Sequence, residues 1–271
     1  MRAGVFLDAL AQDFAVTLLV VPVAGGAQRP MSRFAVERAA RIVTVALDDN
    51  VDPLWTLMGR ISDPDGRTAA FAAYPRPAMC RHASPSYRSA VGAELAPKRF
   101  DVVHVMRSYM TPYAEPFLAE GGERPMPHAT LDLDDDEALT LTRIAALAER
   151  AGALEDARSL ADEAARYRRF EPIWLPRFRL LIAANPAHAQ RLASDNPGRA
   201  VVTVANTVAL PTNRMRVPER PRRGRSVGNA TVFATVTTAR PGLPEASLCA
   251  CAGFAAISNR KRGSHMGSKR L

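Results

Sequence analysis

The sequence predicts an α/β fold in which helices cover both faces of a parallel sheet, followed by a mostly disordered basic tail. Apolar runs of strand length alternate with amphipathic helical segments over residues 1–211, and this alternation favours parallel strands with helical crossovers. Residues 212–271 carry twelve Lys or Arg against two acidic residues, so the chain's net charge of +9 leaves −1 for the first 211 residues. The basic character therefore belongs to the tail and does not describe the folded part.

The expected strands are short apolar runs. The first covers residues 14–23 and is continuous and rich in β-branched side chains, as in a strand buried on both faces. Further strands are expected over residues 41–47, 100–106, 129–133, 179–184 and 200–205. Ligands of parallel sheets bind beyond the carboxyl ends of the strands, so the loops after these runs form the candidate functional edge.

The expected helices lie between these runs. They cover residues 2–13, 66–73, 84–95, 112–120, the stretch from the acidic run 134–137 to about Arg150, residues 155–175 with an interruption near Pro172, and residues 185–193. Leu139, Ile144 and Leu147 are expected on the apolar face of the helix that ends near Arg150. Asn185 is expected as the N-cap of the last helix, with Pro186 at its first position.

Composition restricts the class of protein. The chain has 47% hydrophobic residues but no run of 18 apolar residues, so no membrane-spanning helix is expected. Three cysteines are too few for a disulfide framework, which favours the cytoplasm. Cys249 and Cys251 have no partner at metal-ligand spacing, and we expect no metal site. Of the histidines, His104 is expected to pack in or beside the core, and His128 and His188 to lie on the surface.

The acidic run from Asp132 to Glu137 is the strongest chemical feature. Carboxylates at the end of a strand can transfer protons, bind sugar hydroxyls or hold a divalent cation. The alternative is helix capping by solvated acids, which the chemistry alone favours. Arg107, after the strand at 100–106, could contact an anionic ligand or be an ordinary surface arginine.

Five segments, in their order and spacing, resemble the N-terminal half of a group-1 (retaining, GT-B-type) glycosyltransferase. They are residues 7–19, residues 100–109 (Phe-Asp-Val-Val-His-Val-Met-Arg-Ser-Tyr), residues 130–135 (Thr-Leu-Asp-Leu-Asp-Asp), residues 163–192 and residues 202–211. The resemblance implies that residues 1–211 are a Rossmann-like domain that holds the acceptor. It makes Arg107, Asp132, Asp134 and Asp135 candidates for acceptor binding and Asn206 a candidate interdomain hinge, and it assigns no catalytic residue.

In such a family the intact enzyme transfers a hexosyl group from a nucleotide sugar to a saccharide or lipid-linked acceptor, as in polysaccharide biosynthesis. The nucleotide sugar is a co-substrate, and no other cofactor is implied. The donor-binding half should follow Pro211, but Glu219 and Glu245 lack the family's spacing of seven residues between paired glutamates. We therefore expect a chain truncated or frame-shifted after about residue 211 and inactive by itself, with a basic tail of low order in which only residues 231–237 suggest a strand.

The alternative is a non-enzymatic α/β domain whose basic tail binds nucleic acid or an anionic membrane. Basic tails usually contain lysine, whereas this one is dominated by arginine and includes valine-rich pieces. We therefore favour the glycosyltransferase and do not expect nucleic acid as a partner, while peripheral association with the inner face of the membrane stays open.

Overall fold

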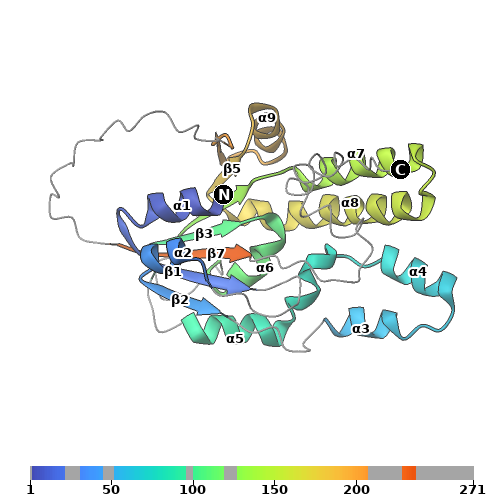
Figure 1. The fold of residues 1–271 in the computed structure, drawn as a ribbon, viewed down its shortest axis with the longest axis horizontal. Coiled ribbons are helices and arrows are strands. Elements are labelled where there is room, and N and C mark those ends of the chain that lie inside the picture. Colours follow the sequence, from blue (N-terminus) through green and yellow to red (C-terminus); the bar gives the residue numbers. More distant parts are fainter. Residues whose placement is uncertain are drawn as a thin grey trace, which may run out of the picture.

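The computed structural model describes residues 2–21, 31–44, 52–95, 100–118, 127–206 and 228–235. Within them, seven strands form one parallel sheet of order β2-β1-β7-β3-β4-β5-β6 (Figure 1). The strands are β1 (Phe14–Val21), β2 (Arg41–Thr44), β3 (Val102–Met106), β4 (His128–Leu133), β5 (Leu180–Ala183), β6 (Ala200–Thr203) and β7 (Gly228–Thr235). The α/β class with a parallel sheet is confirmed, and each of the six runs predicted before residue 211 contains or overlaps an observed strand.

The helices lie between the strands along the chain. They are α1 (Arg2–Leu10), α2 (Arg33–Arg38), α3 (Pro53–Gly59), α4 (Pro64–Ala72), α5 (Pro85–Leu95), α6 (Thr111–Ala114), α7 (Glu137–Arg150), α8 (Leu154–Trp174) and α9 (Pro186–Asp195). Asn185 caps α9 as predicted, because its side chain accepts from the His188 N–H at 2.8 Å and Pro186 follows at the first helical position.

Three helical predictions need correction. Helices α2 and α3 were not predicted, because six or seven residues are too short to show a helical period. Of the helix expected over 112–120, the residues described up to Leu118 form only α6 and a 3-10 turn, since Pro116 lacks the N–H that would continue the α-helical bonding. In contrast, α8 runs through Pro172 to Trp174 without the expected interruption.

Helices cover both faces of the sheet. Along β1, Val16, Leu18 and Val20 pack with residues of α1 and α2 on one face. Leu19 and Val21 point to the opposite face and join a much larger apolar cluster that includes residues of α5 to α9. Figure 1 accordingly shows α1 and α5 on opposite sides of the strands. We call these the α1 face and the α5 face of the sheet.

The apolar side of α7 differs from the predicted one. Its buried apolar residues are Ala138, Leu141 and Ala145, whereas Leu147 is 57% exposed. Helix α7 lies along α8, and its buried residues join the large apolar cluster. The prediction is confirmed for Ile144, which packs against the apolar cluster, and wrong for Leu147, which points to solvent.

Strand β7 lies in the centre of the sheet although it comes from the basic tail (Figure 1). It pairs with β1 over eight positions, from Phe14↔Gly228 to Val21↔Thr235, and with β3 over four. Residues 228–235 therefore belong to the sheet of the domain, and they overlap the one stretch of the tail that suggested a strand. The rest of the tail, including Cys249 and Cys251, lies outside the described residues.

In the described part of the chain, no helix combines the length and apolar character needed to cross a membrane.

Candidate functional site

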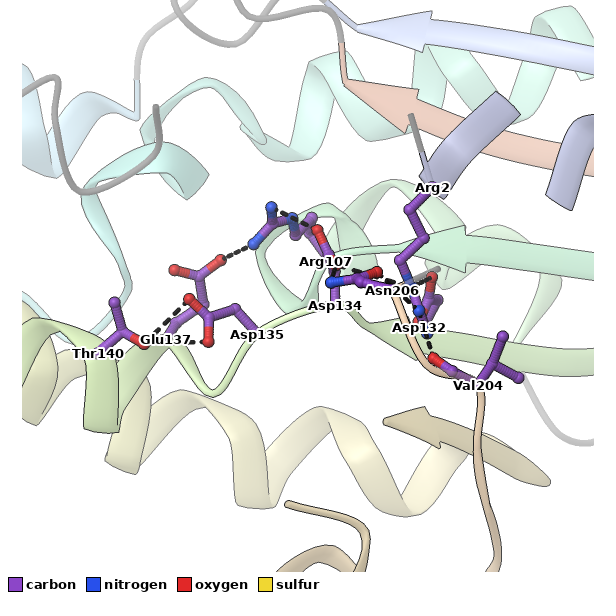
Figure 2. A network of polar contacts seen from close by, with 9 residues as sticks. All are labelled: Arg2, Arg107, Asp132, Asp134, Asp135, Glu137, Thr140, Val204 and Asn206. Atoms are coloured by element: carbon purple, nitrogen blue, oxygen red, sulfur yellow. Dashed lines mark hydrogen bonds and ion pairs between the residues drawn. The ribbon is translucent and has the colours of Figure 1, made fainter. Parts of the chain in front are cut away.

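Side chains from five segments meet at the carboxyl edge of the sheet (Figure 2). Arg107 follows β3, and Asn206 comes three residues after β6. Asp132 is the last but one residue of β4, and Asp134 is the first residue after this strand. The structure thus brings together four of the five residues singled out from the sequence, and it adds Arg2 from the first turn of α1.

The inner half of this site is the ion pair between Asp132 and Arg2. The Asp132 side chain is fully buried, and Arg2 donates to its Oδ2 from Nε at 2.6 Å and to its Oδ1 from Nη2 at 2.7 Å. Arg2 Nη1 also donates to the Val204 carbonyl and to Asn206 Oδ1. Burial raises the pKa of Asp132, while the hydrogen bonds and charge of Arg2 partly offset that rise. Both carboxylate oxygens are engaged, so Asp132 holds Arg2 and does not face a ligand.

The outer half is centred on Arg107. Its guanidinium contacts Asp134 Oδ2 and Glu137 Oε1, each at 2.7 Å, and Asn206 Nδ2 donates to Asp134 Oδ1 at 2.9 Å. The side chains of Arg107 and Asp134 are 27% and 20% exposed, so this pair is accessible to a ligand. Burial acts to lower the pKa of Arg107, but Glu137, Tyr109 and Asp134 outweigh it and hold that pKa above its ordinary value. The arginine is therefore a fixed positive charge.

The backbone of Arg107 is also unusual. Its φ is 74°, the only positive φ of a non-glycine residue in the described ranges. Its N–H donates to the carbonyl of Asp132 at 2.8 Å, which joins the loop after β3 to β4. A left-handed conformation costs a non-glycine residue free energy, so the surrounding contacts must hold it in place.

The acidic run divides into two groups. Asp136 caps α7 by accepting from the Leu139 N–H at 2.9 Å, and it also pairs with Arg191. Asp135 accepts from the Thr140 hydroxyl at 3.0 Å. The capping alternative is therefore confirmed for Asp136, and Asp135 binds Thr140 in the first turn of α7. Asp132 and Asp134 instead pair with arginines (Figure 2).

Two glutamates lie behind the outer half, of which Glu137 is buried and Glu171 is half-buried. Burial raises the pKa of Glu137 to about 7 although Arg107 acts against the rise. Burial likewise raises the pKa of Glu171 to about 7 against the opposing contact with Ser108. Glu137 belonged to the acidic run, but nothing in the sequence marked Glu171 or Arg2, because their partners are distant along the chain.

The histidines take three different positions. His104 is buried in β3, where its Nδ1 lies 2.8 Å from Thr130 Oγ1 and its ring stacks on Phe6, so it packs in the core as expected. Burial, with a smaller contribution from Arg2, lowers the pKa of His104 to about 4 and keeps it neutral. His128 is exposed as predicted. His188 is buried against prediction, because it lies one turn before Leu192 on the face of α9 that is turned away from solvent.

Within the described ranges, no group of three His, Cys, Asp or Glu side chains is arranged to hold a metal ion. The accessible part of the site instead offers a fixed guanidinium, a carboxylate and an amide. Such a set can donate to and accept from the hydroxyl groups of a polar ligand.

Comparison with protein-family models, curated proteins and solved structures found no match.

Proposed function

We propose that this domain binds the saccharide part of an acceptor at the carboxyl edge of its sheet, as the acceptor-side domain of a nucleotide-sugar-dependent glycosyltransferase. The observation that carries the proposal is the Arg107–Asp134 pair, which is charged, held by Glu137 and Asn206, and still partly exposed. A sugar hydroxyl can donate to a carboxylate and accept from a guanidinium at once, so adjacent hydroxyls fit such a pair.

The strand order supports the proposal. If β7 is renumbered as strand 1 and β1 to β6 as strands 2 to 7, the order of the sheet becomes 3-2-1-4-5-6-7. Its first six positions match the strand order of doubly wound nucleotide-binding folds. In those folds ligands bind where the order reverses, and here that point lies between β7 and β3. Arg107 directly follows β3 and so stands at this position.

The charge of the edge favours a saccharide over a phosphate group. Arg2 and Arg107 face Asp132, Asp134 and Glu137, and all three carboxylates already pair with an arginine. Asp135 and Asp136 add further negative charge beside them, and Arg191 offsets only part of it through its ion pair with Asp136. A diphosphate would be repelled by this surplus, whereas neutral hydroxyls would not. We therefore assign the edge to the acceptor and not to the donor nucleotide.

Saccharide titration followed by amide NMR tests the assignment. The probes are glucose, galactose, mannose and N-acetylglucosamine with their disaccharides, added to the labelled full chain. At least one should shift the amides around Arg107 and Asp134. Arg107→Met should weaken that binding about tenfold, because it removes a charge-assisted hydrogen bond.

The matched control is Arg33→Met, which removes an arginine that is 92% exposed and paired with Glu37 on α2. It should leave the titration unchanged. If no saccharide shifts the carboxyl edge, or if both variants weaken binding equally, the assignment fails.

Binding without turnover is the expected behaviour of this chain. Incubation with UDP-glucose or GDP-mannose and a bound saccharide should release no nucleotide. Detectable sugar transfer would contradict this part of the proposal while leaving acceptor binding intact.

A further inference from the structure

The two strands at the centre of the sheet are joined only through a segment from the far end of the chain. Strands β1 and β3 do not pair with each other, because β7 lies between them. The side chains that flank this position on β1 and β3, Val16, Leu19, Val103 and Val105, are fully buried. Without β7, both strands would present unpaired N–H and C=O groups in the interior, which is costly.

The position of β7 follows from the connection rules of parallel sheets. Helix α1 leads directly into β1, as the second half of a β-α-β unit does. The first strand of such a unit normally pairs beside the second, with the helix crossing between them. Strand β7 pairs beside β1 and packs against α1, and its carboxyl end lies at the edge where α1 begins. In space, β7 therefore occupies the place of the first strand of such a unit.

We propose that the gap between β1 and β3 is a strand-accepting slot, and that residues 228–235 fill it as a tethered ligand recognised without chain continuity. Recognition rests on the backbone ladders, which cover eight positions on the β1 side and four on the β3 side. Parallel pairing on both sides satisfies the N–H and C=O groups of an inserted strand and of its neighbours.

The tether, residues 204–227, is longer than the distance that it must span. Strand β7 lies four strand spacings from β6, and the chain must also return to the amino edge, so it must span about 30 Å. Residues 204–227 can reach about 80 Å when extended. A tether of this kind supplies its ligand at an effective concentration of about 1 mM, so at micromolar protein the chain fills its own slot and not that of a second copy.

The slot also controls the candidate site. Arg107 follows β3, and Arg2 belongs to α1, which packs on β1 and β7. Insertion of β7 therefore sets how the two arginines are placed relative to each other. The C-terminal segment thus contributes to the site without supplying any of its side chains.

Cutting the tether tests the proposal in the full chain. A recognition sequence for a sequence-specific protease is inserted between Asn213 and Arg214, and the cut protein is examined by size-exclusion chromatography and mass spectrometry. The two pieces should elute together under native conditions and separate only in denaturant. A C-terminal piece that leaves under native conditions overturns the proposal, whether or not the other piece stays soluble.

A pair of proline variants shows whether the ladder causes the retention. Thr231→Pro removes a backbone donor at the position that pairs with both Thr17 and Val103, and the cut C-terminal piece should then dissociate. Ala246→Pro, which lies beyond the strand, should leave the pieces together. Retention of the Thr231→Pro piece would show that the association does not use the slot.

Discussion

The two faces of the sheet differ in kind although the same strands form both. On the α5 face, Val103, Val105 and Leu131 enter one continuous apolar cluster with residues of α5 to α9. On the α1 face, His104 and Asp132 project from the alternate positions of β3 and β4 and meet Phe6 and Arg2. The apolar cluster on this face is small and lies mainly over β1.

This difference separates stability from ligand chemistry. The α5 face buries enough apolar surface to hold the helices on the sheet. The α1 face carries polar side chains that are satisfied by specific partners, and these partners lead to the accessible Arg107–Asp134 pair at the carboxyl edge. Loss of packing should therefore act mainly on the α5 face, and loss of charge pairing on the α1 face.

The largest expected effect is a cavity on the α5 face. Leu131→Ala removes a fully buried side chain from the large cluster and should lower the free energy of unfolding by about 4 kcal/mol. Leu18→Ala, on the α1 face, should cost about 2 kcal/mol because fewer packed neighbours are left around the cavity. Denaturant unfolding with unchanged m-values measures both. Equal losses would contradict the difference between the faces.

The next effect concerns the buried ion pair of the α1 face. Asp132→Ala leaves the guanidinium of Arg2 without its bidentate partner and should cost about 3 kcal/mol. The loss stays at the lower end of the usual range because Val204 and Asn206 still accept from Arg2.

The double variant Arg2→Met with Asp132→Leu is the control for this effect. It removes both charges and should recover most of the stability, since a buried pair costs desolvation energy that apolar residues avoid. Simple addition of the two single losses would show that Arg2 and Asp132 act independently.

The local sequence was sufficient to predict the strands and the long helices. Continuous apolar runs specified β1 and β3, and the Asn185–Pro186 pair specified the start of α9. The similar Asp52–Pro53 pair marked the start of α3 and could have revealed that helix. Signals of this kind involve residues within one turn or one strand, which is why they can be recognised in a single sequence.

The sequence could not predict the pairing across the molecule. Arg107, Asp132, Asp134 and Asn206 were expected at one edge because parallel strands end together. No local sequence signal indicates that Arg2 binds both carboxylate oxygens of Asp132, since 130 residues separate the two. The central place of β7 was equally hidden, because a strand in a basic, proline-containing stretch carries no information about its neighbours.

The smallest expected effect is that Glu171 of α8 and His104 of the α1 face respond to pH in opposite directions. The pKa of Glu171, raised by burial to about 7, lies above its value in the unfolded chain, so its contribution to stability falls as pH rises from about 4.5 to 7. Glu137 acts in the same direction. The pKa of His104, lowered by burial to about 4, makes its contribution rise with pH between about 4 and 6.5. His82, whose pKa burial also lowers to about 4, acts in the same direction as His104. Two rising and two falling contributions should leave the stability of the protein nearly flat between pH 5 and 6.5.

Glu171→Gln should reveal the increase of stability with pH that His104 contributes. In this variant the free energy of unfolding should increase by about 1–2 kcal/mol more than in the unchanged protein between pH 5 and 7, because one group with a raised pKa no longer opposes the rise. His104→Gln should do the reverse and make stability fall over the same range. Denaturant unfolding at several pH values measures both slopes. If both variants changed the slope with the same sign, the two groups could not be titrating as their burial requires, and the contrast between the faces would reduce to packing alone.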